Sequence, residues 1–287
     1  MTATVLIADR NAAHRIILRS MTAGVFDRTR MAGTVDELMA DLSLDLPDMI
    51  VIAADMVASP LADLIARVRL MAPGTPVMVV VADALPAHIA AFDAGADDVM
   101  AQPLNQALFH ARARRLLRNH APAVSRATGL AEAAGDFSGV IPVVLLRTHA
   151  TAGGDLVGSD LQDNIARDLR RVGLSISSPD TAAHAVALYW GVGQPIDRAY
   201  SVLDTGGHDG PTRSVICVIP HASPEAEATL LAYGAADVQT GPPASELLRA
   251  RIDRIRRSKR KRPAAAPMEA MDGRSLSPRG LVSHERS

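Results

Sequence analysis

Short apolar runs alternate with amphipathic stretches along the first 120 residues of the chain. The runs at 4–8, 49–53 and 76–81 contain no charged side chain, as expected for parallel strands that are buried on both faces. Between them, apolar residues recur at helical spacing, and Ile16, Ile17 and Met21 form one predicted stripe of a helix at 12–23. The other elements predicted in this half are a weak strand at 30–33 and helices at 35–42, 61–71, 86–94 and 105–118. This alternation predicts five βα units in one doubly wound parallel sheet.

The pattern restarts after residues 121–139, which lose periodicity and gather Ala, Gly, Pro and Ser. The second half is predicted to contain strands at 141–146, 174–177, 199–204 and 214–219, and helices at 160–171, 182–190, 224–233 and 245–257. We therefore expect an α/β protein with domains at 1–120 and 140–257, joined by a linker at 121–139. Residues 258–287 begin with basic residues and are then rich in Pro and Ser, which predicts a disordered basic tail.

Composition narrows the class of protein. The chain has 287 residues and a net charge of −1, so no overall field favours nucleic acid. Its one cysteine, Cys217, lies in an apolar run, which excludes a disulfide framework and a cysteine-based metal site. The apolar runs are strand-sized and no targeting segment is apparent, so we expect a cytoplasmic protein without a membrane span.

An internal repeat links the two halves. The segment FDAGADDVMAQP at 92–103 matches AYGAADVQTGPP at 232–243. The spacing is constant, because Gly95 pairs with Gly234 and Val99 with Val238, each 139 residues apart. An arginine-rich helix is predicted after each copy, which indicates that one domain type occurs twice.

The segment at 92–103 resembles the end of helix 4 and strand 5 of bacterial response-regulator receiver domains, the CheY-like superfamily. The usual pattern there is Ala-Gly-Ala-Asp-Asp, an aromatic residue, two small residues and Lys-Pro. The resemblance implies two flavodoxin-like (βα)5 domains in tandem. This tandem arrangement is similar to the paired receivers at the N-terminal end of PleD-type diguanylate cyclases, without a GGDEF output domain.

The resemblance also implies where a phosphorylation site would lie, and the groups needed there are missing. Ala53 stands at the aspartate that accepts the phosphoryl group, Val81 at the hydroxyl position and Gln102 at the lysine position. The metal-binding acid pair is reduced to Asp9 followed by Arg10. Carboxylate oxygens are what Mg²⁺ requires, so we expect no Mg²⁺, no cofactor and no enzymatic activity. The first domain is predicted to be a pseudo-receiver.

Two aspartates leave an alternative open. Asp55 follows the third strand and is a possible displaced acceptor, while Asp204 ends the segment predicted as the corresponding strand of the second domain. A phosphorylation-dependent regulator would use one of them. The other second-domain positions carry no supporting group; they are Arg147, Thr148, Pro220 and Gly241.

A receiver without a phosphorylation site keeps its interaction surface, chiefly helix 4, strand 5 and helix 5. Candidate contact residues on this surface are Asp97, Asp98, Val99, Arg112 and Arg115. In the family, the aromatic side chain at this position moves inward when the hydroxyl residue binds the phosphoryl group. Val99 is too short to make this movement, so the resemblance implies that the domain stays in one conformational state. Expected partners are a histidine kinase, a response regulator or a diguanylate cyclase in a two-component phosphorelay network, or a second copy of the chain.

The basic run at the C-terminal end allows another function. It contains Arg249, Arg251, Arg254, Arg256, Arg257, Lys259, Arg260, Lys261 and Arg262. Binding of nucleic acid or of a scaffold is one interpretation. Aromatic residues are not interleaved with these charges, so we interpret the run as a solvated helix face followed by a basic tail.

Overall fold

The computed structural model describes residues 2–58, 60–120, 140–146, 155–177, 186–192, 194–206 and 214–261. The predicted linker at 121–139 and residues 262–287 of the predicted tail lie outside these ranges. The last helix continues to Lys261, so the prediction that the tail begins at 258 is wrong. Lysine and arginine are good helix formers, which allows the backbone to stay helical through this basic stretch.

The first domain alternates strands and helices in the predicted order. Its elements are β1 (Thr4–Ala8), α1 (Ala12–Thr22), β2 (Arg28–Ala32), α2 (Val35–Leu44), β3 (Met49–Ala53), the short 3-10 helix η1 (Ala54–Met56), α3 (Leu61–Met71), β4 (Val77–Val81), α4 (Leu85–Asp93), β5 (Asp98–Ala101) and α5 (Gln106–His120). Its strands pair in parallel in the order β2-β1-β3-β4-β5.

Alternation along the buried strands separates two apolar layers in this domain. Val5 and Ile7 point to the face that α1 and α5 cover, where Phe109 is fully buried. Leu6 and Ala8 point to the opposite face, which α2, α3 and α4 cover. The sheet is therefore enclosed on both sides, and its strand ends form the edge where the predicted site lies.

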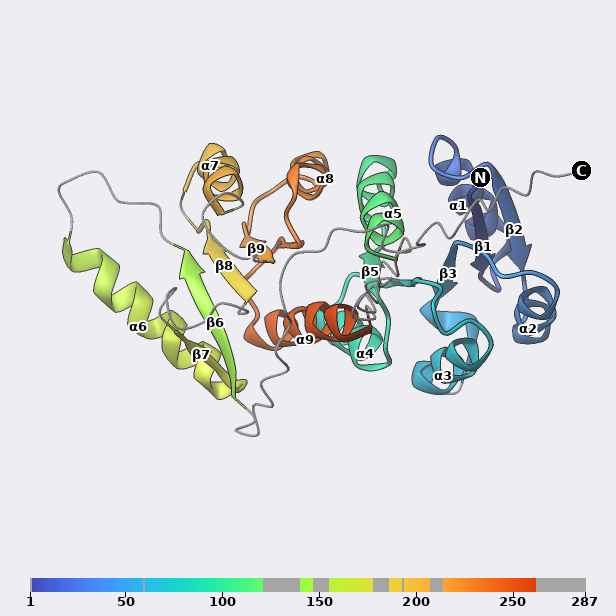
Figure 1. Cartoon of the computed structure of the whole chain (residues 1–287), viewed down its shortest axis with the longest axis horizontal. Helices are drawn as coiled ribbons and strands as arrows, with labels where there is room; N and C mark the ends of the chain where they lie inside the picture. The colour runs from blue at the N-terminus through green and yellow to red at the C-terminus, as the bar shows by residue number, and fades with distance from the viewer. Residues whose placement is uncertain are drawn as a thin grey trace, which may run out of the picture.

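The second domain repeats this topology. Its elements are β6 (Ile141–Leu146), α6 (Asp155–Arg171), β7 (Leu174–Ile176), β8 (Val186–Trp190), α7 (Asp197–Gly206), β9 (Val215–Val218), α8 (Pro224–Tyr233), β10 (Asp237–Gln239) and α9 (Ser245–Lys261). The strand order β10-β9-β8-β6-β7 is that of the first sheet read from the other edge. The predicted fold class, two flavodoxin-like α/β domains, is confirmed (Figure 1).

Two elements of the second domain were predicted with the wrong type. The predicted helix at 182–190 ends in the strand β8, and the predicted strand at 199–204 lies within the helix α7. Both segments are short and apolar, and Ala199, Val202 and Leu203 fit helical spacing as well as a buried strand. The helix that follows the third strand of this sheet, α7, therefore has ten residues.

Helix α1 presents a different face to the core than predicted. Leu18 is buried, whereas Ile16 and Ile17 are 66% and 45% exposed. Met21 does pack against the core, as predicted. Asn11 is the N-cap of this helix, and its side chain accepts hydrogen bonds from the backbone N–H groups of Ala13 and His14. Among the described residues, no helix has both the length and the apolar character needed to cross a membrane.

Candidate functional site

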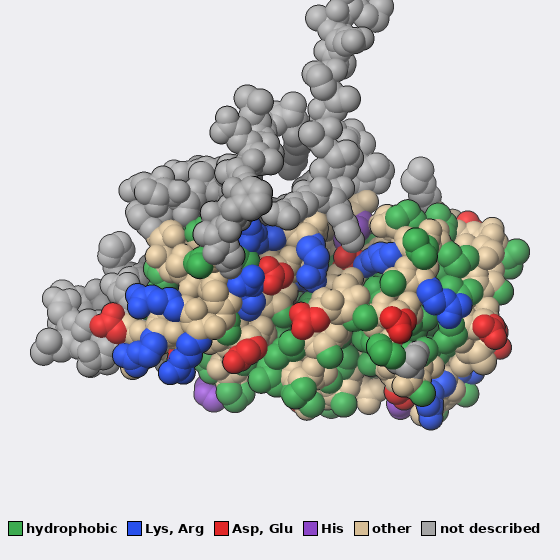
Figure 2. Space-filling view, turned by 90° about the horizontal axis from the view of Figure 1, so that it is seen from below, with side chains coloured by type: hydrophobic (Ala, Val, Ile, Leu, Met, Phe, Trp, Pro, Cys, Tyr) green, Lys and Arg blue, Asp and Glu red, His purple; other side chains and the backbone are tan. Residues whose placement is uncertain are grey.

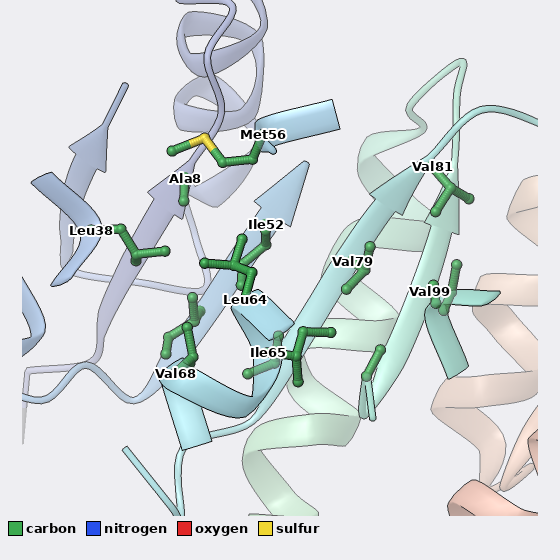
Figure 3. Close-up of a cluster of buried hydrophobic side chains, with 14 of the residues drawn as sticks. Ala8, Leu38, Ile52, Met56, Leu64, Ile65, Val68, Val79, Val81 and Val99 are labelled. Carbon is green, nitrogen blue, oxygen red and sulfur yellow. The ribbon is translucent and has the colours of Figure 1, made fainter. Parts of the chain in front are cut away.

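The carboxyl edge of the first sheet is apolar where the predicted phosphorylation site would lie. Ala53, at the end of β3, and Val81, at the end of β4, are each 2% exposed. Met56 from η1 packs into the same core cluster as Ala8 and Val81. Figure 3 shows Met56 lying beside Ala8, and Val81 and Val99 together at the other end of the cluster. None of these five side chains can accept or bind a phosphoryl group.

One acid remains at this edge. Asp9 is buried and one of its carboxylate oxygens accepts a hydrogen bond from the backbone N–H of Asn11, at 2.7 Å. Its other oxygen, Oδ2, lies 3.5 Å from Nδ1 of His14. The backbone carbonyl of Asp9 accepts a hydrogen bond from the Arg15 guanidinium, at 2.7 Å. Asp9 therefore organises the start of α1 through local contacts.

Arg10 and Asp55 lie close together at the same edge. The Arg10 guanidinium donates a 3.5 Å hydrogen bond to the backbone carbonyl of Asp55, and both side chains are exposed. Gln102 is also exposed, and its backbone N–H donates to the carbonyl of Val81 at 3.0 Å. Beside Asp55 the structure thus provides one cation, from Arg10. In the described residues, no three His, Cys, Asp or Glu side chains are placed to hold a metal ion.

Asp204 does not occupy the acceptor position predicted for the second domain. The third strand of this sheet is β8, which ends at Trp190. Asp204 lies on the exposed side of α7, where its carboxylate accepts a 3.0 Å hydrogen bond from the Tyr233 hydroxyl. The prediction failed because it took α7 for a strand. Arg147 and Thr148 lie outside the described residues.

The predicted hydroxyl position of the second domain lies just beyond strand β9. Gly241, at the predicted lysine position, donates its backbone N–H to the carbonyl of Pro220 at 2.9 Å. This bond repeats the one from Gln102 to Val81 in the first domain, so Pro220 and Gly241 correspond to Val81 and Gln102. The hydroxyl, lysine and acceptor positions of this domain therefore all lack the side chain that the chemistry needs.

The surface predicted to bind partners is buried inside the chain. Helix α5 packs against α8, and α4 packs against α9, so the two domains meet through their corresponding faces (Figure 1). The apolar contacts are reciprocal. Leu108 and Ala111 of α5 join the core cluster of the second domain, while Leu247 and Ala250 of α9 join that of the first. These residues correspond at the 139-residue spacing, which shows a pseudo-twofold interface.

A buried cluster of arginines and aspartates lies at this interface. In the first domain, Asp98 pairs with Arg112 at 2.6 Å and with Arg115 at 2.5 Å. The second domain repeats the arrangement 139 residues later, where Asp237 pairs with Arg251 and Arg254. All six side chains are buried, and the two aspartates are 0% exposed.

Contacts across the interface tie the two halves of the cluster together. Arg112 pairs with Glu227 of α8, and Arg115 lies 3.5 Å from Asp237. The backbone contacts are again symmetric, because Arg115 donates to the carbonyl of Ala236 and Arg254 donates to that of Asp97. Each domain therefore uses the same arginine to reach the same backbone position in the other.

The charges of the cluster support each other electrostatically. Burial raises the pKa of Asp98, but Arg112 and Arg115 outweigh burial, so this pKa lies below its ordinary value. The pKa of Asp237 is lowered in the same way, with Arg251 and Arg254 as the largest opposing charges. Burial, followed by repulsion from Arg115, lowers the pKa of Arg254 to about 10. Asp98, Asp237 and Arg254 are therefore charged at neutral pH.

This geometry corrects two interpretations of the sequence. Asp98, Val99, Arg112 and Arg115 are buried and do not form a free surface for a partner or a second copy. Asp97 is also buried, and it pairs with Arg69 of α3. Buried ion pairs are costly to break, because removal of one partner leaves the other charge uncompensated.

The basic run at the C-terminal end is also not a uniformly solvated helix face. Arg251 and Arg254 are buried in the cluster, and Arg249 donates to the backbone carbonyl of Val172 at 2.8 Å. Figure 2 shows basic and acidic side chains interleaved over the face it presents. Asp237 and Glu227 were not identified as site residues from the sequence. The 139-residue repeat could have identified Asp237, because it is the counterpart of Asp98 in the second domain.

Comparison with known proteins finds similarity to solved structures only; no family model and no curated protein matches the chain. A response-regulator structure from Chloroflexus aurantiacus is 25% identical, with a TM-score of 0.39; the alignment covers 41% of this chain and 99% of that one. A response regulator from Thermotoga maritima is 21% identical over the same shares, with a TM-score of 0.38. The receiver domain of a sensor histidine kinase from Pseudomonas aeruginosa, solved with magnesium in its active-site cleft, is 15% identical over 41% of this chain and 99% of that chain (TM-score 0.38). The function is therefore inferred from the side chains of this protein.

Proposed function

We propose that this protein is a non-enzymatic, receiver-like signalling protein that acts through protein contacts and accepts no phosphoryl group. The observation that supports this most directly is the apolar carboxyl edge of the first sheet. Ala53 and Val81 are buried there beside Met56, so a hydrophobic layer occupies the place of an acceptor and its hydroxyl. Stabilising a transferred phosphoryl group requires preorganised donors and cations, and this edge has few.

The pairing of the two domains supports a role as one interaction unit. Each domain covers the helix 4–strand 5–helix 5 face of the other. The surface through which a receiver that is not phosphorylated would be expected to bind partners is therefore covered within the chain itself. Contacts with a histidine kinase, a response regulator or a diguanylate cyclase are proposed to use surfaces outside this interface. The exposed apolar pair Ile16 and Ile17 on α1 is one place to test.

Incubation with acetyl phosphate or beryllofluoride and Mg²⁺, followed by intact-protein mass spectrometry, tests the absence of phosphoryl acceptance. We expect no covalent adduct from acetyl phosphate and no change in unfolding temperature with beryllofluoride. A stable adduct would overturn the proposal. Asp55→Asn and Asp204→Asn would then identify the acceptor, because only the variant that lacks it loses the adduct.

A second experiment concerns partner contacts. Charge reversal at Arg112 or Arg115 would break the contact between the two domains, so it cannot report on an external partner. The double variant Ile16→Ser/Ile17→Ser changes an exposed surface instead. Affinity measured against purified candidate signalling proteins should fall for this variant if α1 forms part of the contact, with Arg19→Ala on the same helix as the matched control.

A further inference from the structure

The pseudo-twofold interface is not symmetric at the charged group that lies opposite Arg112. At the 139-residue spacing Arg112 corresponds to Arg251, and Glu227 corresponds to His88. Arg112 reaches across the interface to the Glu227 carboxylate. Arg251 instead has its guanidinium over the Phe92 ring of α4, 5.6 Å from the ring centre. His88 lies one helical turn before Phe92 on α4, so a histidine stands where symmetry would place a carboxylate.

The charge balance of the buried cluster makes this position sensitive. Its cations are the guanidinium groups of Arg112, Arg115, Arg251 and Arg254, and its anions are the carboxylates of Asp98, Asp237 and Glu227. Positive charge is thus already in excess by one. A protonated His88 would add a further cation on the side of the interface where no carboxylate lies opposite Arg251 in the described residues.

We propose that His88 makes the contact between the two domains sensitive to pH, because its protonation places a positive charge beside Arg251 and weakens the packing of α4 against α9. The other half of the interface, between α5 and α8, keeps the Arg112–Glu227 pair in both protonation states. This inference concerns the contact between the domains and does not depend on whether the protein accepts a phosphoryl group.

The groups around His88 act mostly in one direction. Burial lowers the pKa of His88 most, Arg251 of α9 and Arg112 of α5 lower it further, and Asp83 before α4 opposes them. On the neighbouring α3 and at the start of β5, Arg69 and Asp97 neutralise each other. The folded protein holds His88 in its neutral form more strongly than the unfolded chain does, because the pKa of His88 is lowered on folding. The resulting contribution to stability is complete above the ordinary pKa of 6.5 and is lost as the pH falls from 6.5 toward the lower pKa of the folded protein.

Urea unfolding of the full chain at pH values of about 7.5 and 5.5 gives the first measurement. One histidine that stays neutral in the folded protein increases the unfolding equilibrium constant by at most about tenfold over this interval. We expect this constant to increase several-fold more in the wild type than in His88→Gln, which cannot titrate. His88→Glu places a carboxylate opposite Arg251, as Glu227 lies opposite Arg112, and should make the increase smaller as well.

Energy transfer between dyes on α1 and α6 then reports on the domain contact itself. Exposed Ser20 and Asp163 can be replaced by cysteine and labelled, because burial raises the pKa of the native Cys217 thiol to about 12 and leaves it unreactive. We expect transfer to change between these pH values in the wild type and in His221→Gln, an exposed-histidine control, and to stay constant in His88→Gln. An equal pH response in the wild type and His88→Gln in both assays would overturn the inference.

Discussion

Replacing Asp237 by asparagine removes one negative charge from the centre of the buried cluster and keeps the shape of the side chain. Asp237 is 0% exposed, and four guanidinium groups lie around its carboxylate. The distances are 2.5 Å to Arg251, 2.9 Å to Arg254, 3.5 Å to Arg115 and 3.7 Å to Arg112. Asparagine can still accept the 2.9 Å hydrogen bond from the backbone N–H of Val238. The variant therefore isolates the charge.

The expected loss in the free energy of unfolding is about 3–5 kcal/mol, the cost of leaving buried charges without their partner. Asp98→Asn should cost less, because among the described residues two guanidinium groups, those of Arg112 and Arg115, pair with that carboxylate. Asp253→Asn is the matched control on α9: its pair with Arg249 is partly exposed and should contribute less than about 1 kcal/mol.

Urea unfolding followed by circular dichroism reports on the whole chain, and the fluorescence of Trp190, the single tryptophan, reports on the second domain. The pKa of Asp237 is lowered in the folded protein, so its contribution is complete above its ordinary value of 3.8 and is lost as the pH falls below it. The difference between wild type and variant should therefore shrink in acid. A loss below about 1 kcal/mol at neutral pH, or one equal to that of Asp253→Asn, would refute the reasoning.

Two further predictions concern the cores. The Tyr189 hydroxyl is buried and has no hydrogen-bond partner among the described residues, so Tyr189→Phe should raise the free energy of unfolding by about 1 kcal/mol in urea titrations; a loss of stability would indicate a bond that the structure does not show. On α1, Leu18→Ala should cost about 2–5 kcal/mol, whereas Ile16→Ala should change stability by less than about 0.5 kcal/mol. Similar losses for the two variants would contradict the observed orientation of the helix.

Much of the fold was readable from the chain. Unbroken apolar runs such as Met49–Ala53 and Val77–Val81 are typical of parallel strands that are buried on both faces. The repeat that pairs Gly95 with Gly234 predicted a second domain of the same type, and the second sheet has the same strand order. The sequence also shows Ala53 at the predicted acceptor position and Val81 at the predicted hydroxyl position. The structure adds that both side chains belong to a hydrophobic layer.

Errors arose where a short apolar segment fits two periods. Residues 197–206 form α7, although Ala199, Val202 and Leu203 are compatible with either a helix or a strand. On α1, Ile16 and Ile17 form an apolar stripe next to the true core stripe, and only packing against α5 decides between them. Local periodicity does not record which neighbour a face will meet.

The amino-acid sequence by itself determined the two βα domains and their matching order, because both follow from the residue types along one stretch of chain. The tertiary structure alone decided what the arginine-rich helices do. Arg112 and Arg251 appear as surface charges in a helical pattern, yet the pairing of the two domains buries both beside Asp98 and Asp237. Burial of a charge depends on partners distant in the chain, and these come together only when the domains pack.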